Sequence, residues 1–183
     1  MAPVSSETAR DAGADPALSL IDIALRRVPQ RLDGIDADAM HVVLLLHRVT
    51  NAIVYDLETN VHRPSGWSWS AFRLLFTLWV DGPLDSKDAA AKTGMSRPAV
   101  TSLVKTLAGQ HLVQRDESPD DGRSVVLSLT AKGIGDLESV YRRHNARESQ
   151  WVNAISEDDR ATLLRILGQV ADTAQSDWVT HRS

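Results

Sequence analysis

The chain has 183 residues, of which 43% are hydrophobic and 24% are charged, so it can bury a core and is not a disordered polypeptide. It contains no cysteine, which excludes disulfides, thiol redox sensing and zinc bound by cysteine. The sequence shows neither an apolar run long enough to cross a bilayer nor a signal-peptide pattern, and we expect a cytoplasmic protein with no membrane partner.

The charge is unevenly distributed along the chain. The net charge is −4 with a pI near 5.8, which by itself argues against nucleic acid as a partner. Residues 87–115 hold five basic residues against one acidic residue, a net charge of +4 that leaves −8 for the rest. Because salt screens charges beyond about 8–10 Å, the distant acidic residues do not cancel the attraction of this segment for phosphate.

The N-terminal part predicts a tail followed by two helices. Residues 1–15 carry few apolar side chains and are predicted to be a disordered tail. A helix over 18–32 follows, and Pro29 is expected to kink or end it. A longer helix, from near Asp36 or Asp38 to about Val61, is apolar around much of its circumference, which predicts burial against other helices or in a subunit interface.

A third helix, rich in aromatic residues, is expected between the break at 64–66 and Gly82. Ser68 or Ser70 can cap its N-terminus. The segment over 83–133 then reads PLDSKDAAAKTGMSRPAVTSLVKTLAGQHLVQRDESPDDGRSVVLSLTAKG. It predicts a two-residue strand, two short helices joined by a glycine turn, and a β-hairpin with a charged tip.

The two short helices are predicted from their end residues. Ser86 can cap the first, which ends at Gly94, and Ser96 can cap the second. The second helix has apolar residues at three- and four-residue spacing on its inner side. Its outer side is polar, suits a DNA major groove, and carries the predicted DNA contacts Ser96, Arg97, Pro98, Thr101, Ser102 and Lys105.

Two further helices are predicted after the hairpin. Thr130 can cap a long helix that runs to about Ala154, and Ser156 can cap a final one in a variant of the capping box. The final helix has an apolar stripe made of Leu163, Leu167, Val170, Ala174 and Trp178. Because a winged helix of about 50 residues cannot bury the stripes at both chain ends, we expect these helices to pack against a second copy of the chain.

The sequence therefore predicts a mainly α-helical fold with a small β-hairpin wing. A winged helix-turn-helix over 67–129 is expected to be flanked by helical dimerisation regions over 16–66 and 130–183. This order of elements resembles the MarR family (multiple antibiotic resistance regulators) over roughly residues 38–178. The motifs that carry the resemblance are GMSRPAVTSLVKTLAGQHLVQR and SPDDGRSVVLSLTAKG.

The resemblance implies a homodimer whose two winged helices read a palindromic operator in double-stranded DNA, often with a small-molecule ligand that releases the DNA. It places Arg123 of the wing in the minor groove, where a narrow groove attracts a guanidinium group. Asp121 is then expected to orient that arginine. The helix over 18–32 is similar to the N-terminal extension of the urate-responsive branch of the family.

One residue departs from the family pattern. The family usually has glycine at the end of the recognition helix, where this chain has His111 before Leu112. That position favours a positive φ, which histidine adopts at some cost. Either the turn is built differently here or His111 makes a contact that compensates.

Aromatic residues gather on the third helix and the segment before it, which contain Trp67, Trp69, Phe72, Phe76 and Trp79. One interpretation is a packed core layer. The other is an aromatic pocket in which Arg73 binds an anionic aromatic ligand. The residues assigned to such a pocket are His47, Asn51, Trp67, Trp69, Arg73, Phe76 and His111.

The six histidines show no metal-binding spacing, and the sequence contains no catalytic or nucleotide-binding motif. We therefore expect no enzyme activity, no metal and no cofactor. The favoured hypothesis is a dimeric, sequence-specific DNA-binding transcriptional regulator, a repressor released by a small aromatic or anionic ligand. The alternative is a winged-helix dimer that binds other proteins without specific DNA recognition. Exposed positions for Arg97, Lys105 and Arg123 favour the first hypothesis.

Overall fold

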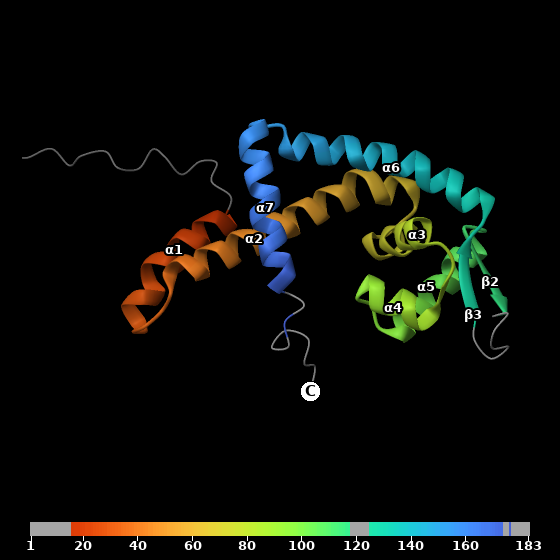
Figure 1. Ribbon diagram of the computed structural model, residues 1–183, viewed down its shortest axis with the longest axis horizontal. Coiled ribbons are helices and arrows are strands. Elements are labelled where there is room, and N and C mark those ends of the chain that lie inside the picture. Colours follow the sequence, from red (N-terminus) through yellow and green to blue (C-terminus); the bar gives the residue numbers. More distant parts are fainter. Residues whose placement is uncertain (1–15, 118–124, 174–175, 177–183) are drawn as a thin grey trace, which may run out of the picture. The chain divides into compact units, whose positions relative to one another are not determined.

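The computed structural model describes residues 16–117, 125–173 and 176 (Figure 1). The chain divides into two compact units, one ending at Asp56 and the other beginning at Leu57. In the described part, none of the helices is both long enough and apolar enough to span a membrane. The tail predicted over 1–15 lies outside the described residues.

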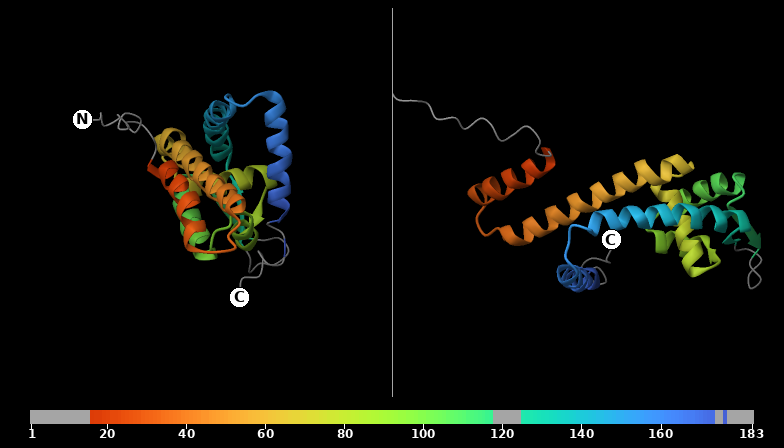
Figure 2. Two further views of the ribbon diagram at one scale, coloured as in Figure 1. Left: turned by 90° about the vertical axis from the view of Figure 1, so that its left-hand side faces the viewer. Right: turned by 90° about the horizontal axis from the view of Figure 1, so that it is seen from above.

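The first unit contains α1 (Pro16–Arg31) and most of α2 (Ala37–Leu57). Pro29 lies inside α1, which continues to Arg31, so the proline does not end the helix at its own position. The backbone N–H of Ala39 donates to the Asp36 carboxylate at 2.9 Å, which confirms the predicted start of α2. In Figure 2 α1 doubles back beside the beginning of α2. Four large apolar side chains of α2 are exposed in the single chain, namely Val42, Val43, Val49 and Tyr55.

The second unit begins with irregular helical turns and a capped helix. α2 passes into a π-helical turn (η1, Glu58–His62) and a 3₁₀ turn (η2, Arg63–Ser65) before α3 (Trp69–Asp81). The hydroxyl of Ser68 accepts a hydrogen bond from the backbone N–H of Ala71 at 3.1 Å. Of the two predicted caps, Ser68 is therefore the one that is used.

The helix-turn-helix follows a two-residue strand. β1 (Leu84–Asp85) leads directly into α4 (Ser86–Thr93), and α5 (Arg97–Gly109) comes next. The prediction that Ser86 caps α4 is wrong, because Asp85 has extended backbone angles and its carboxylate accepts from the N–H of Asp88 at 2.7 Å. Gly94 ends α4 with φ +65, as predicted.

The wing is an antiparallel sheet with strand order β1-β3-β2. β2 (Val113–Glu117) pairs with β3 (Val125–Leu129) along its whole length, while β1 pairs with the other edge of β3. The predicted hairpin is confirmed. Its tip, with the predicted wing residues Asp121 and Arg123, lies outside the described residues.

α3 lies at the centre of the second unit, between the helix-turn-helix and α6 (Ala131–Val152), and α6 follows β3 directly (Figures 1 and 2). The buried residues of α3 are Ala71, Phe72, Leu74, Leu75 and Leu78. Each buried leucine or phenylalanine contributes about 1.5–3 kcal/mol to folding. The last helix, α7 (Glu157–Thr173), begins where Ser156 was predicted to cap it, and its N-cap hydroxyl accepts from the N–H of Asp159 at 3.2 Å.

His111 itself adopts the left-handed conformation at the end of α5, with φ +59. The N–H of His111 donates to the carbonyl of Ala108 at 2.9 Å, and the N–H of Leu112 donates to that of Leu107 at 3.0 Å. These two bonds form a Schellman motif, and both leucines are buried, which compensates for the strain of about 1–2 kcal/mol. The turn is therefore the usual one, built with histidine in place of glycine.

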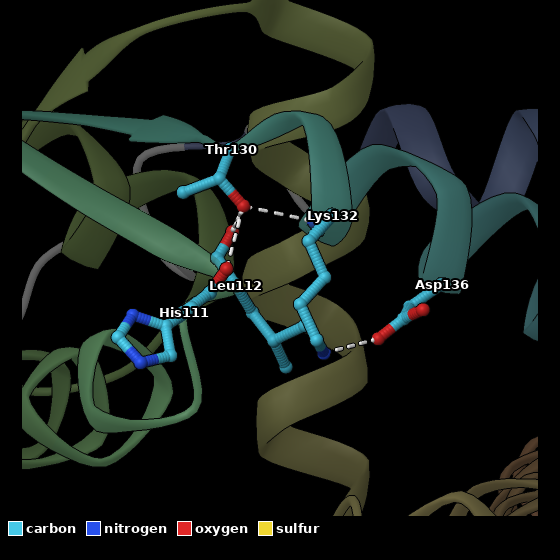
Figure 3. A network of polar contacts seen from close by, with 6 residues as sticks. His111, Leu112, Thr130, Lys132 and Asp136 are labelled. Atoms are coloured by element: carbon cyan, nitrogen blue, oxygen red, sulfur yellow. Dashed lines mark hydrogen bonds and ion pairs between the residues drawn. The ribbon is translucent and has the colours of Figure 1, made fainter.

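A polar junction joins this turn to α6 (Figure 3). The hydroxyl of Thr130 donates to the carbonyl of His111 at 2.6 Å, and the N–H of Thr130 donates to the carbonyl of Leu112 at 3.1 Å. The same hydroxyl accepts from the N–H of Gly133 at 2.9 Å, which confirms Thr130 as the cap of α6. Gly133 packs so closely on Leu112 that a Cβ atom would overlap its carbonyl group.

Replacing Gly133 is expected to push the start of α6 away from Leu112. Gly133→Ala should lower the free energy of unfolding by about 2–3 kcal/mol, because the added methyl group meets backbone atoms that cannot turn away. Gly135→Ala is the matched control, since nothing lies within 4 Å of its Cβ position in the same helix, and it should be neutral or stabilising by up to ~1 kcal/mol. Urea denaturation followed by circular dichroism measures both. Equal effects of the two substitutions would contradict the close approach.

Candidate functional site

The outer side of α5 is the first candidate surface. Of the residues predicted to contact DNA, the six at the start and on the outer side of α5 are all exposed, and they are Ser96, Arg97, Pro98, Thr101, Ser102 and Lys105. The inner side is buried through Val100, Val104 and Leu107, as the spacing predicted.

Two of these outward polar groups already have partners within the helix. The Ser96 hydroxyl accepts from the N–H of Ala99 at 3.3 Å and caps α5. The Thr101 hydroxyl donates to the carbonyl of Arg97 at 3.0 Å and keeps its acceptor lone pairs. The side chains of Arg97, Ser102 and Lys105 are therefore the best candidates for contacts with DNA from this surface.

A cavity of about 300 Å³ lies behind the helix-turn-helix, enclosed by α3, α4 and α6. Its walls combine aromatic rings with charged groups, and the lining residues are Trp69, Phe72, Arg73, Phe76, Thr77, Lys92, Thr93, Tyr141, His144 and Glu148. The rings of Phe76 and Tyr141 stack with centroids 5.2 Å apart. A cavity of this size suits a ligand built on one aromatic ring.

The guanidinium of Arg73 connects the cavity to the helix-turn-helix. Its Nη2 donates to the backbone carbonyl of Thr93, the last residue of α4. A cation is favoured at this end of a helix because the terminal carbonyl groups carry partial negative charge. Thr93 is itself buried, and it is followed within three residues by Ser96, the cap of α5.

Two buried histidines stand beside the cavity. His62 of η1 is 0% exposed and His144 of α6 is 4% exposed, and His62 Nε2 lies 3.0 Å from His144 Nδ1. Both rings stack on Phe72, with centroid distances of 4.3 and 4.4 Å. His144 Nε2 lies 3.1 Å from the Glu148 carboxylate, which forms the cavity wall.

The chemistry of the three side chains fixes which of them donates and which accepts in this series of hydrogen bonds. An ionised carboxylate only accepts, so His144 donates through Nε2 to Glu148 and accepts through Nδ1 from His62 Nε2–H. The remaining nitrogen, His62 Nδ1, is buried without a partner among the described residues, and in this arrangement it is a bare lone pair. Burial lowers the pKa of His62 to about 4, with His144 adding to the effect. Burial also lowers the pKa of His144, and Glu148 acts in the opposite direction.

The structure brings together three of the seven residues assigned to a ligand pocket, because Trp69, Arg73 and Phe76 all line the cavity. Trp67 is buried and lines a smaller cavity of about 190 Å³. His111 lies at the end of α5 and is absent from the residues that line the cavity.

His47 and Asn51 lie on α2 in the first unit and pair with each other. The side-chain nitrogen of Asn51 lies 2.9 Å from His47 Nε2, and both side chains are exposed. Neither residue is among those that line the cavity of the second unit.

The comparisons with known proteins find transcriptional regulators with a helix-turn-helix. Residues 67–125 match the model of the MarR family. The chain is 26% identical over 148 residues to the uncharacterised HTH-type transcriptional regulator YwaE of Bacillus subtilis. The aligned region covers 81% of this chain and 85% of YwaE. The repressor CouR, solved bound to a 23-mer DNA duplex, has a TM-score of 0.64 and 27% identity and covers 70% of this chain and 90% of that one.

The fold is also that of the PcaV regulator of Streptomyces coelicolor, solved in complex with its natural ligand. The TM-score is 0.64 at 22% identity, over 79% of this chain and all of the other. The winged helix over residues 67–125 is therefore similar to that of the MarR family. The proteins that this chain resembles are DNA-binding transcriptional regulators with a winged helix, which are not enzymes. The assignment to the urate-responsive branch stays a prediction.

Sequence reasoning missed the α6 side of the cavity. Tyr141, His144 and Glu148 follow at three- and four-residue spacing and therefore share one face of the helix. That spacing was visible in the sequence, but nothing in it indicated that this face meets Phe72 of α3. Among the described residues, no group of three histidine or acidic side chains is arranged to hold a metal ion.

The buried histidine pair predicts how the stability of this protein depends on pH. The pKa of His62 is about 4 when folded and near 6.5 when unfolded, so the unfolded state binds more protons below pH 6.5. The contribution to stability is complete above pH 6.5 and is lost between pH 6.5 and about 4, by ~2–3 kcal/mol.

Urea titrations at a series of pH values measure this loss. His62→Gln keeps an N–H donor towards His144 but cannot titrate, so its stability should fall less steeply over that interval. His47→Gln, which removes an exposed histidine, is the control and should behave as the wild type. A pH profile that His62→Gln leaves unchanged would contradict the assigned burial.

Proposed function

We propose that this protein is a homodimeric repressor that binds a palindromic operator and is released from it by a small aromatic or anionic ligand. The observation that carries the proposal is the pairing of an exposed polar helix face on α5 with a cavity behind the same helix-turn-helix. A protein of this kind works where the chromosome is, and so in the cytoplasm.

DNA recognition is assigned to α5 and the wing. Arg97 and Lys105 are exposed, and the segment over 87–115 has a net charge of +4. Arginine reads base edges through paired hydrogen bonds, while lysine more often neutralises phosphate. Arg123 is assigned to the minor groove and Asp121 to its support, on the strength of the family resemblance.

The dimer is supported by apolar surface that a single chain leaves uncovered. On α7 five large apolar side chains are exposed, and they are Leu163, Leu164, Ile166, Leu167 and Val170. On α2 another four are exposed. Many exposed apolar side chains on one helix mark an interface, and a second copy of the chain can cover them. CouR and MarR of E. coli, both solved with DNA, support recognition of a duplex by this fold.

Ligand release is assigned to the contact between Arg73 and Thr93. An anion that binds the guanidinium competes with the Thr93 carbonyl at the end of α4. Loss of that contact frees the turn that leads into Ser96 and α5, so the recognition helix shifts relative to its half-site. The complex of PcaV with its natural ligand supports ligand control by this fold. A ligand that favours the released state by ~3 kcal/mol weakens DNA binding over a hundredfold.

Substitutions on α5 test the DNA-binding surface. With an operator selected from randomised duplexes, Lys105→Ala should weaken binding and lower the salt slope by about one charge. Arg97→Ala should cost ~1–3 kcal/mol and relax the preferred sequence at one position in each half-site. Arg165→Ala, an exposed arginine on α7, is the control. Fluorescence anisotropy across a salt series gives the affinities.

The same assay compares the full palindrome with a single half-site, and a dimer should bind the palindrome far more tightly. No sequence preference in the wild type, with the fold intact by circular dichroism, would instead favour the protein-interaction module. Equal binding of the palindrome and the half-site would contradict the dimer.

The role of Arg73 is tested by titrating 4-hydroxybenzoate into the protein–operator complex. The ligand should quench tryptophan fluorescence, because Trp69 lines the cavity, and should release the DNA. Arg73→Ala should lose most of the response, measured as the ratio of operator affinities without and with ligand. Arg63→Ala, an exposed arginine that pairs with Glu58, should keep it. An unchanged ratio of operator affinities in Arg73→Ala would contradict the assignment of the anion site to Arg73.

A further inference from the structure

We propose that the smaller cavity is a second ligand site, which takes small aliphatic hydroxy acids, that is, carboxylates that also carry hydroxyl groups. This cavity of about 190 Å³ is formed by η2, the turn after it and α6. Its lining residues are Ser65, Trp67, Asp136, Ser139, Val140 and Arg143. It shares no lining residue with the larger cavity behind the helix-turn-helix, so the inference does not rest on the proposed function.

One wall of the smaller cavity is a single face of α6. Asp136, Ser139, Val140 and Arg143 are related by three- and four-residue spacing and therefore share one side of the helix. Seven residues separate Asp136 from Arg143, which is about 10.5 Å along the helix axis. An acidic and a basic residue thus stand two turns apart in one wall, with a serine and a valine between them.

Arg143 is the anion-binding group of this wall. Its Nη2 donates to the Ser65 hydroxyl at 2.9 Å, and that hydroxyl donates to the carbonyl of Val61 at 2.9 Å. These two bonds tie the guanidinium to η2 and leave its other N–H groups for a carboxylate. The structure shows no ion pair of Arg143 within the described part of the chain, so its charge is not compensated there.

Asp136 is the acceptor for a hydroxyl group of the ligand. Its Oδ2 accepts from Lys132 Nζ at 2.6 Å (Figure 3), and a carboxylate has room for further hydrogen bonds. Because Lys132 compensates the charge of Asp136, a second ammonium group gains little here, whereas a neutral hydroxyl donates without repulsion. The Ser139 hydroxyl, exposed on the same face, is able both to donate and to accept.

The combination of these groups gives the selectivity. A carboxylate without hydroxyl groups satisfies Arg143, but it removes water from Asp136 without replacing the lost hydrogen bonds. A polyol satisfies Asp136 and leaves the guanidinium without an anion. The Asp136 side chain is 47% exposed, so water compensates in part, and we expect each missing group to weaken binding about tenfold.

The experiment compares three compounds of four carbons each on the full chain labelled with nitrogen-15. L-threonate has both the acid and the hydroxyl groups, butyrate has only the acid, and L-threitol has only hydroxyl groups. NMR titrations give the affinities, and the wild type should bind L-threonate about tenfold more tightly than either of the others. The indole signal of Trp67, identified by its loss in Trp67→Phe, should shift because Trp67 lines the cavity.

Substitutions on α6 separate the two contacts. Arg143→Gln should bind L-threonate no better than L-threitol, and Asp136→Ala should bind it no better than butyrate. All three positions changed on α6 are exposed, and the third, Arg142→Ala, is the control because Arg142 does not line the cavity and should keep the wild-type order.

Equal binding of the three compounds by the wild type would overturn the inference. Binding of L-threonate without a shift of the Trp67 signal, or with an affinity that Arg143→Gln leaves unchanged, would overturn it as well. Failure of L-threonate to bind the wild type would overturn the hydroxy-acid site and leave the proposed function standing, since that function concerns the larger cavity. The wild-type series decides the question even if a variant does not fold.

Discussion

The hydrogen bond from Arg73 to the carbonyl of Thr93 connects the two candidate sites of this protein, the helix-turn-helix and the cavity. It joins the central helix α3 to the end of α4 across the wall of the cavity. A positive charge at that helix end is favourable, so the contact stabilises the helix-turn-helix even without a ligand. The same arginine is thus both a structural contact and the proposed site for an anion.

The aromatic cluster answers a question that the sequence left open. Packed core and ligand pocket were alternatives, and the structure shows a packed aromatic layer that also forms one wall of a cavity. Phe72 is buried and stacks on both histidines, and it lines the cavity together with Trp69 and Phe76. The buried histidines add polar atoms to an otherwise apolar layer, and one nitrogen of His62 finds no partner in the described part of the chain. In return they hold Glu148 in a fixed direction.

Local signals predicted most of the fold. The caps at Ser68, Ser96 and Thr130 depend on side chains three residues from the N–H groups they bind, and such short-range chemistry is legible in a sequence. The error at Ser86 arose because two adjacent residues are both good caps. Pairing of β1 with β3 holds Asp85 in an extended conformation, and this long-range contact decided between them.

Of the candidate site, only the residues on α3 were predicted from the sequence. Trp69, Arg73 and Phe76 recur at three- and four-residue spacing on α3, so their common face followed from helical periodicity. The other wall depends on a contact between α3 and α6, elements about 70 residues apart in the chain. Periodicity within α6 groups His144 with Glu148 but gives no information about which helix they meet.

The recognition helix is held at both ends by contacts of different kinds. At its N-terminus the turn before Ser96 is tied to α3 through Thr93 and Arg73. At its C-terminus the carbonyl groups of His111 and Leu112 bind Thr130, and the close packing of Gly133 leaves that end little freedom (Figure 3). In the proposed mechanism a ligand acts only on the first end. The helix would then tilt about its fixed C-terminal end, and a small change at Arg73 would move the N-terminal residues, which enter the groove first, the furthest.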